Sequence, residues 1–167
     1  MLVLITASVT IFDKMDENRK KVLGRLQSLC AKREYCRSDI MSKAVKLLEG
    51  DREAAELVVE ALVKDKFVDD LRYASAFARE KSSLSGWGAV KIGYMLSAKG
   101  IDRQTIAAAL EEVDPLKAEK KMRSVIEAKY RLLADDPQCR LKLLRFALSR
   151  GYEYDDVKAV IDSVIKS

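Results

Sequence analysis

The sequence lacks histidine entirely, and its 167 residues include only two prolines, seven glycines and three cysteines. Cys30, Cys36 and Cys139 are widely spaced and form no C-x-x-C pair. Without histidine and without paired cysteines, a zinc site would lack its usual ligands. We therefore expect no metal and no cofactor, and we expect the cysteines to be half-buried thiols of a cytoplasmic protein.

A long apolar run is absent as well, so a membrane-spanning helix is not expected. Residues 1–12 are apolar, but they lack the positively charged start and the small-residue cleavage site of a signal peptide. Their β-branched side chains favour an extended arm or a short strand, and a disordered segment is the alternative. We assign residues 1–13 to this arm and give it little functional weight.

The sequence contains no recognisable catalytic motif. Gly86-Trp87-Gly88 stands just before a helical pattern, with Lys91 one turn further on, as a phosphate-binding loop would. However, the stretch follows a helical pattern instead of a strand, and its spacing matches neither G-x-G-x-x-G nor G-x-x-x-x-G-K-S/T. No serine or cysteine has the context of an activated nucleophile. We expect a protein that is not an enzyme, and we interpret these glycines as a joint between two helices.

Residues that favour helices are abundant, because 49% of the chain is apolar, 34% is charged and few residues break helices. Gly50, Gly100 and Gly151 each end a helical pattern, at intervals of 50 and 51 residues. The apolar helical face that follows Gly100 returns after Gly151 at the same shift: Ile106, Ala109, Leu110 and Val113 are matched by Val157, Val160, Ile161 and Val164. This periodicity predicts an internal repeat.

Aspartates mark the starts of the predicted helices. Asp51 and Asp102 are well placed as N-caps, and two Asp-Pro pairs combine an N-cap with proline at the first helical position, Asp114-Pro115 and Asp136-Pro137. The pattern predicts an all-α fold of three tandem three-helix repeats whose thin cores lean on each other in an elongated, curved array. We place these repeats at residues 14–68, 69–114 and 115–167.

The net charge of +5 is unevenly distributed along the chain. Counting lysine and arginine against aspartate and glutamate gives +6, −4, +6 and −2 for residues 14–46, 47–114, 115–150 and 151–167. Two basic zones separated by an acidic zone suit a nucleoprotein partner better than a small neutral substrate. Solvated helix faces are the ordinary alternative, and charge alone does not exclude them.

The residues around the predicted joints resemble the RecX family, which regulates the RecA recombinase of bacteria. The resemblance is carried by REYCRSDIMSKAVKLL (residues 33–48), ALVKDKFVDDLRYASAFARE (61–80), GWGAVKIGYMLSAKGI (86–101) and LRFALSRGY (144–152). It extends from about Leu23 to the C-terminus, and its most specific parts are the R-E-Y-x-R stretch and the block from Phe67 to Ile101.

The resemblance implies a non-enzymatic modulator, and we expect the protein to be a monomer. RecX-like proteins bind the filament of RecA on single-stranded DNA along its groove, limit its growth and so suppress ATP hydrolysis and strand exchange in recombination and SOS repair. Weak binding to single-stranded DNA would be compatible with that role. A stand-alone DNA-binding protein and a generic helical-repeat adaptor remain the alternatives.

The candidate contacts to a partner or to DNA are basic or aromatic residues near the joints and in the last basic zone. They are Arg33, Tyr35, Arg37, Arg72, Arg79, Lys81, Lys91, Lys99, Arg140, Lys142, Arg145 and Arg150. Arg72 has a rival role, which is to neutralise Asp69 and Asp70. Binding is favoured most for the group from Arg140 to Arg150, because no acidic residue interrupts it. Trp87 is expected to pack at the joint, and an interface anchor is the alternative.

Overall fold

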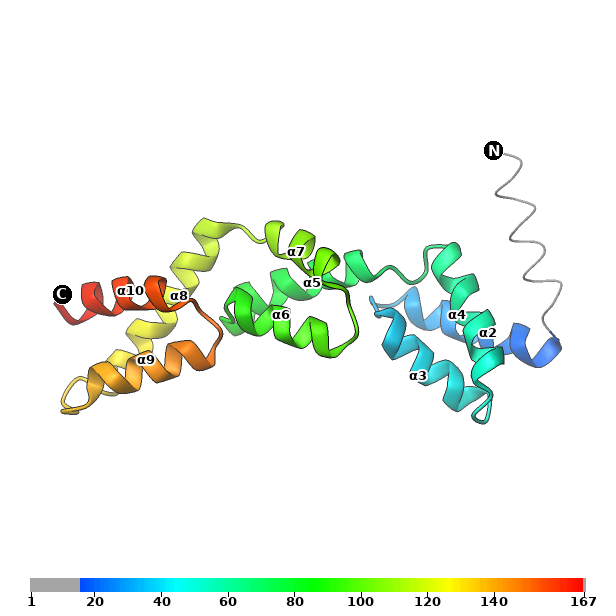
Figure 1. Cartoon of the computed structure of the whole chain (residues 1–167), viewed down its shortest axis with the longest axis horizontal. Helices are drawn as coiled ribbons and strands as arrows, with labels where there is room; N and C mark the ends of the chain where they lie inside the picture. Colours follow the sequence, from blue (N-terminus) through cyan, green and yellow to red (C-terminus); the bar gives the residue numbers. More distant parts are fainter. Residues whose placement is uncertain (1–15, 167) are drawn as a thin grey trace. The chain divides into compact units, whose positions relative to one another are not determined.

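A computed structural model describes residues 16–166, and the secondary structure in this range is entirely helical (Figure 1). The all-α prediction is therefore confirmed, whereas the predicted arm at residues 1–13 lies outside the described range. The helices are α2 (Glu17–Cys30), α3 (Arg37–Leu47), α4 (Arg52–Lys64), α5 (Asp70–Glu80), the π-helical turn η1 (Lys81–Ser85), α6 (Ala89–Ala98), α7 (Arg103–Glu111), α8 (Pro115–Arg131), α9 (Cys139–Ser149) and α10 (Tyr154–Lys166). None of them is both long and apolar enough to cross a membrane.

Three of the predicted aspartate N-caps are present. The carboxylates of Asp51, Asp102 and Asp114 accept hydrogen bonds from the first backbone N–H groups of α4, α7 and α8. The prediction for Asp136-Pro137 is wrong, because α9 begins only at Cys139. The Asp136 carboxylate instead accepts from the backbone N–H of Gln138 at 2.8 Å and also binds Lys142, so it stabilises a turn ahead of the helix.

The N-terminal unit, which ends at Tyr73, is built around α2, α3 and α4. α4 packs against both α2 and α3, and α2 also contacts α3. Leu26, Ile40 and Leu62 are fully buried at the centre of this three-helix core. Burial of such side chains contributes about 1.5–3 kcal/mol each, so the three helices stabilise one another.

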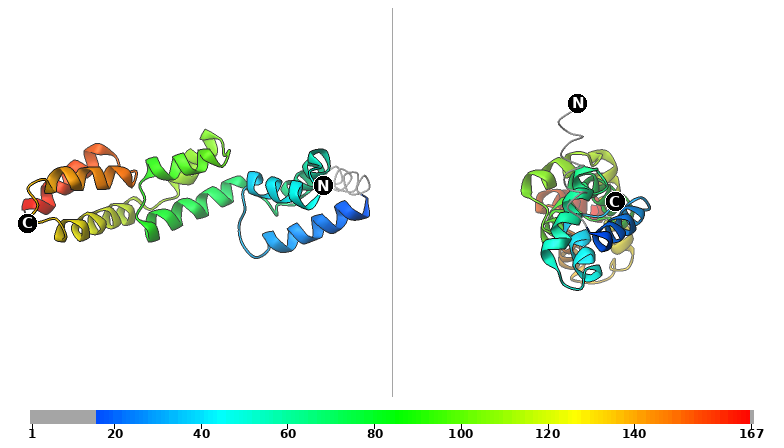
Figure 2. Two further views of the ribbon diagram at one scale, coloured as in Figure 1. Left: turned by 90° about the horizontal axis from the view of Figure 1, so that it is seen from below. Right: turned by 90° about the vertical axis from the view of Figure 1, so that its right-hand side faces the viewer.

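The C-terminal unit begins at Ala74 and contains most of α5 and all of η1 and α6 to α10. α6 packs on α7, while α8, α9 and α10 contact one another, as the C-terminal part of Figure 2 shows. Ile126, Leu143 and Ile161 form the centre of the core between α8, α9 and α10. The described helices follow one another in groups of three, and the repeat boundaries at 14–68, 69–114 and 115–167 stay a prediction.

The three repeat glycines all adopt left-handed backbone conformations just beyond helix ends. The φ angles of Gly50, Gly100 and Gly151 are 94°, 78° and 83°, and these residues follow α3, α6 and α9. A positive φ costs glycine little but strains other residues. The glycine spacing in the sequence therefore reports the helix ends correctly.

The three cysteines are free thiols. Burial is the main cause that raises the pKa of Cys30 and of Cys36 above the usual range, so both thiols are poor nucleophiles at neutral pH. Among residues 16–166, no group of three or more cysteine, aspartate or glutamate side chains is arranged to hold a metal ion.

Candidate functional site

The Gly86-Trp87-Gly88 stretch docks the start of α6 onto the end of α9. The backbone N–H of Gly88 donates to the carbonyl of Arg150 at 2.8 Å, and the N–H of Val90 donates to the carbonyl of Gly151 at 3.1 Å. A Cβ atom on Gly88 would lie 2.2 Å from the Gly151 carbonyl oxygen, so only glycine fits. These backbone groups are hydrogen-bonded within the protein. The stretch thereby connects α6 to α9, two helices that are distant in sequence. We call it the α6–α9 joint.

Arg150 completes the α6–α9 joint. Its guanidinium donates to the carbonyls of Ser85 and Gly86 at 2.7 and 3.4 Å and lies over the ring of Phe146. A charged group that binds main-chain carbonyls in a half-buried position stabilises the fold locally. Its predicted role as a partner contact is therefore joined by a structural role within the chain.

Trp87 packs at this joint, half-buried. Its ring meets Phe77 edge-on with centroids 6.4 Å apart, and the Nζ atoms of Lys91 and Lys81 lie 4.5 and 5.7 Å from its centroid. Lys91 also reaches the carbonyl of Ser149 at 3.5 Å. Both lysines thus contribute cation–π contacts to the joint while their head groups stay partly accessible.

Most polar groups of the R-E-Y-C-R stretch interact with other residues of the N-terminal unit. Tyr35 is buried, and the Arg33 guanidinium lies 4.4 Å from the centroid of its ring. The backbone N–H of Arg37 donates to the Asp70 carboxylate at 2.7 Å, and the Arg37 side chain pairs with Glu56. Arg33 keeps an exposed guanidinium, so it is the member of this stretch best placed to meet a partner.

The partner of Arg72 differs from the two carboxylates considered from sequence. Its Nε donates to Glu34 at 2.7 Å, and this hydrogen bond is the main cause that raises the pKa of Arg72. Its Nη2 also donates to the carbonyl of Lys66 at 3.1 Å. The Asp69 carboxylate instead accepts from the backbone N–H of Arg72. Arg72 therefore ties α5 to the loop before α3 and to the loop after α4.

The basic group of α9 is partly neutralised by neighbouring elements. Arg140 forms an ion pair with Asp162 of α10, and Lys142 forms one with Asp136 in the preceding turn. Arg145 is exposed and has no ion pair within the described range. The sequence run contains no acidic residue, but folding brings one from 22 positions away. Exposed pairs of this kind are weak and can be exchanged for a partner's charges.

The remaining two candidates differ in exposure. Arg79 pairs with Glu112 at the end of α7, and both side chains are about half exposed. Lys99 is half-buried at the end of α6. Neither residue belongs to the basic group of α9.

The main basic hollow of the C-terminal unit was not predicted. It encloses about 580 Å³ between the end of α5, η1 and the start of α8. The residues that give it positive charge and hydroxyl groups are Arg79, Ser83, Lys117, Lys120, Lys121 and Ser124. We call it the basic groove. Lys120 and Lys121 form no ion pair within the described range, whereas Lys117 lies 3.5 Å from Asp114.

A signal for the basic groove was present in the sequence. Lys117, Lys120 and Lys121 are spaced i, i+3 and i+4, so they share one face of α8. What the sequence did not reveal is the opposite wall, because the turn η1 at the end of α5 is distant from α8 along the chain. The stem of Lys121 crosses this wall, where its Cε would lie 3.4 Å from a Cβ atom on Gly86.

Comparisons with known proteins define the class first: an all-α protein of tandem three-helix domains. Residues 69–110 match the second three-helix domain of RecX, and residues 118–161 match the third. The chain is similar to a crystal structure of regulatory protein RecX with a TM-score of 0.79 and 20% identity, over 94% of this chain and 76% of that one. It is similar to RecX from Lactobacillus salivarius with a TM-score of 0.77 and 19% identity, over 92% and 100%. At these identities the structures show the fold.

Sequence relatives establish the family. The regulatory protein RecX of Chromohalobacter salexigens is 31% identical over 130 residues, which cover 78% of this chain and 84% of that protein. The RecX of Clostridium tetani is 31% identical over 121 residues, which cover 70% of this chain but only 55% of that protein. The chain belongs to the RecX family, and the name of its relatives assigns it a regulatory role.

Proposed function

We propose that this protein regulates a RecA recombinase in the cytoplasm, without catalysis of its own, by binding the filament that the recombinase forms on single-stranded DNA. Family membership supports the regulatory role, and the resemblance to RecX supports the filament as partner. The structural observation that carries the proposal is the basic groove. Among the described residues, Lys120 and Lys121 have no ion-pair partner there, and they lie beside Lys117 and Arg79, which pair with Asp114 and Glu112. Such a filament presents DNA phosphates and protein carboxylates together.

The chemistry of the groove suits anions held on an extended surface. Lysine acts as a mobile point charge, and the hydroxyls of Ser83 and Ser124 add neutral donors along the same hollow. The Arg79–Glu112 pair is exposed, so opening it costs little and releases a guanidinium for a bidentate contact. The groove would therefore fix the register of the protein on the filament, while contacts elsewhere decide the partner.

Binding along the filament explains regulation without chemistry. A monomer that occupies the surface on which protomers are added limits growth, and fewer ordered protomers hydrolyse less ATP and exchange fewer strands. Its contribution is an equilibrium shift toward shorter or inactive filaments, whose size is set by its differential affinity for the two states.

The test is a titration of this protein into the cognate recombinase with single-stranded DNA and ATP. ATP hydrolysis should fall at sub-stoichiometric protein. The double variant K120Q/K121Q should require several-fold more protein for the same inhibition, whereas K158Q/K166Q, which removes two lysines from α10 outside the groove, should act as the parent does. Full ATP hydrolysis at equimolar parent protein would overturn the proposal.

Direct binding to single-stranded DNA is the second candidate, and the basic groove is the observation that favours it. Three to four phosphates held by this groove predict a slope of about −2 to −3 for the logarithm of affinity against that of salt concentration. Glutamate at Arg140, Lys142 and Arg145 should weaken DNA retardation if the surface of α9 takes part. If no retardation occurs at low salt without recombinase, this candidate is excluded and the first is unaffected.

A further inference from the structure

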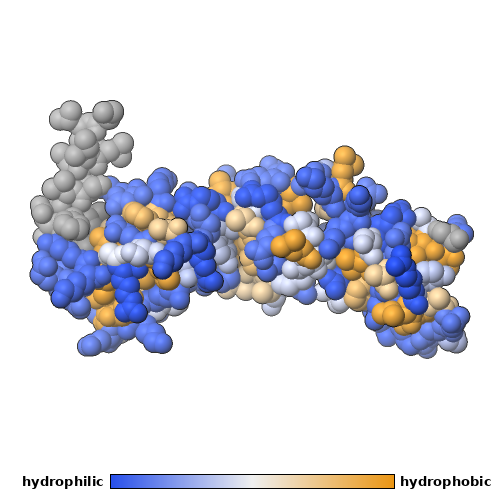
Figure 3. Space-filling view, turned by 180° about the vertical axis from the view of Figure 1, so that it is seen from behind, coloured by the Kyte–Doolittle hydropathy of each residue, from blue (hydrophilic) through white to orange (hydrophobic). Residues whose placement is uncertain are grey.

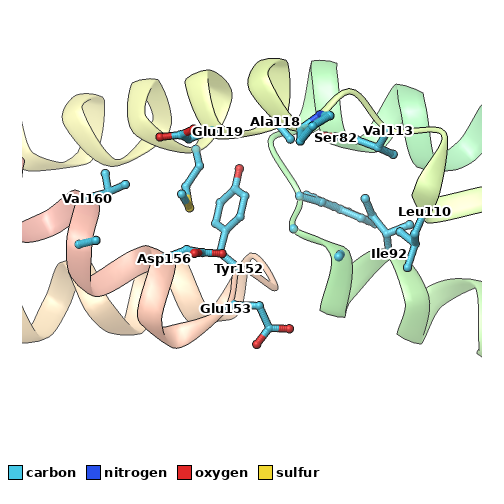
Figure 4. Close-up of a pocket in the computed structure, with 16 residues that line it drawn as sticks. Ser82, Ile92, Leu110, Val113, Ala118, Glu119, Tyr152, Glu153, Asp156 and Val160 are labelled. Atoms are coloured by element: carbon cyan, nitrogen blue, oxygen red, sulfur yellow. The ribbon is translucent and has the colours of Figure 1, made fainter. Parts of the chain in front are cut away.

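A second hollow of the C-terminal unit differs from the basic groove in chemistry. It encloses about 430 Å³ between the helices α6 and α7 on one side and α8 and α10 on the other (Figure 4). Its lining combines apolar side chains with three carboxylates: Trp87, Ile92, Leu110, Glu119, Glu153 and Asp156. We call it the acid-rimmed cavity. On the side shown in Figure 3, the hydrophobic residues at the surface of this unit form separate patches among hydrophilic ones.

Glu119 and Asp156 lie toward one end of this cavity together with Val160, and Glu153 lies apart from them. In the view of Figure 4, Ile92 and Leu110 lie on one side of the Tyr152 ring, and Glu119 and Asp156 lie on the other. Ile92 is fully buried, so the apolar surface that a ligand could reach at this end is that of the half-buried Leu110. A ligand that fills both ends must therefore carry an apolar part and a cationic part.

Within residues 16–166, the three carboxylates have no ion-pair partner. Glu119, Glu153 and Asp156 are exposed and form no ion pair within the described range. Negative charge at the start of α10 is favoured by the helix dipole, which accounts for Asp156 and also for its neighbour Asp155. The dipole does not account for Glu119, which comes from the second turn of α8 and faces the same cavity.

Tyr152 supplies an aromatic wall next to these carboxylates. Its hydroxyl oxygen is buried, and burial raises the pKa of Tyr152, so the ring stays neutral across the physiological range. A neutral phenol ring attracts a cation over its face, in addition to the attraction of the carboxylates.

The α6–α9 joint holds the two ends of the cavity at a constant separation. Gly88 and Val90 donate hydrogen bonds to the backbone at the end of α9, and Arg150 donates to the backbone before α6. These bonds hold the loop that carries Tyr152 against the start of α6. Because the cavity is already formed, binding does not include the free-energy cost of ordering its walls.

We propose that the acid-rimmed cavity is the docking site for a segment of a partner protein that inserts a large apolar side chain beside a lysine or arginine. The apolar side chain would contact Leu110, and the cation would lie beside Glu119 and Asp156 against Tyr152. Three negative charges exclude a phosphate backbone, so this site takes protein and not nucleic acid. The inference goes beyond the proposed function, because it concerns a site with the charge opposite to that of the basic groove.

The experiment uses acetyl-phenylalanyl-arginine amide as a probe, with acetyl-phenylalanyl-glutamine amide as its uncharged counterpart. Trp87 is the only tryptophan of the chain and lines the cavity, so its fluorescence reports occupancy directly. The arginine probe should produce a saturable change with a millimolar dissociation constant, and the glutamine probe should bind at least two- to fivefold more weakly. The absence of a saturable change, or equal binding of both probes, overturns the proposal.

Two pairs of variants locate the binding site. D156N should weaken the arginine probe two- to fivefold and leave the glutamine probe unchanged, whereas D155N removes the same charge from the same helical turn outside the cavity and should change neither. A159L fills the cavity from an exposed position and should abolish binding of both probes, whereas A159S should not. Equal effects of D156N and D155N would show long-range attraction instead of docking.

A second copy of this chain is the rival occupant. Concentration-dependent dimerisation in sedimentation that A159L abolishes would assign the cavity to self-association and overturn the proposal, whereas a monomer at all concentrations is the expected result. Because these titrations contain neither recombinase nor DNA, their failure leaves the proposed regulatory function untouched, and the ATPase titration can fail without affecting them.

Discussion

The basic groove and the acid-rimmed cavity are opposite in charge although they share part of their walls. Ser82 and Val113 line both, and both use the first turns of α8. The difference arises from helix geometry. Lys117, Lys120, Lys121 and Ser124 line the groove, whereas Ala118, Glu119 and Met122 line the cavity. One helix therefore presents two chemistries to two hollows, because successive residues are rotated by about 100° and these two sets fall on nearly opposite faces.

The comparison teaches that the net charge of a segment is a poor guide to what it binds. Residues 115–150 carry +6 in total, yet they contribute the acidic residue Glu119 to one hollow and three lysines to the other. The α6–α9 joint supplies Trp87 and Gly88 to the lining of the acid-rimmed cavity.

The largest effect is expected for G88A. A Cβ atom would lie 2.2 Å from the Gly151 carbonyl oxygen, so the backbone of one partner must move, and the free energy of unfolding should fall by about 3 kcal/mol. Urea denaturation measures the change, and the charge selectivity of both hollows should weaken with it. G24A is the control, since nothing lies within 4 Å of a Cβ atom there and alanine favours the interior of α2. Equal stability of G88A and the parent would contradict the close packing of Gly88 against Gly151.

A smaller loss is expected for R150Q. It removes hydrogen bonds from a charged group to the carbonyls of Ser85 and Gly86, which should lower the free energy of unfolding by about 2 kcal/mol. R140Q on the same helix breaks only the exposed pair with Asp162 and should cost clearly less than R150Q. If both variants lose the same amount in denaturant titrations, Arg150 has no special role in the joint.

Charge reversal should separate the two hollows from each other. K120E/K121E should raise the concentration needed to inhibit the recombinase ATPase by about tenfold, because two attractive charges become repulsive, while the arginine probe still binds at Trp87. E119K should do the opposite: it should weaken the arginine probe and preserve binding through the groove. A loss of both activities in either variant would mean that the hollows do not act independently.

The smallest effect is the dependence of stability on acid. The backbone N–H of Lys117 is the main cause that lowers the pKa of Asp114, the N-cap of α8 at the edge of the basic groove. A carboxyl with a depressed pKa stabilises the folded state above its unfolded pKa of about 4, and that contribution is lost as the pH falls through the folded value. Stability should therefore be flat near neutrality and fall below about pH 4. D114N keeps a capping side chain and should flatten this acid slope; an unchanged slope would locate the effect elsewhere.

Much of the fold could be predicted from sequence, because helix ends depend on local chemistry. Gly100 and Gly151 terminate helices through their own left-handed conformation, and Asp102 caps α7 through the N–H of a residue three positions away. The prediction failed at Asp136-Pro137, where the carboxylate binds a turn and a lysine instead of starting α9. The success at Asp102 and the failure at Asp136 have the same origin. An aspartate can accept from several nearby backbone N–H groups, and only some of them belong to the first turn of a helix.

Less of the candidate site could be predicted. The run from Arg140 to Arg150 is basic in sequence, but Asp162 neutralises one end and the carbonyls of Ser85 and Gly86 receive the other. The basic groove was missed because its lysines face a turn that lies more than thirty positions earlier in the chain. Trp87 was expected at a joint, and it packs there, but the cavity beside it could not be foreseen from its neighbours.

The sequence by itself determined the helical fold, most of the helix ends and the membership of the RecX family, because each depends on spacings of a few residues or on motifs read in order. Only the tertiary structure decided which charges remain available to a partner and which face a hollow. The physical reason lies in the joint around Gly88 and Gly151, 63 residues apart, whose backbones meet at a distance that only glycine allows. That contact joins helices that are distant in sequence, and no local pattern records it.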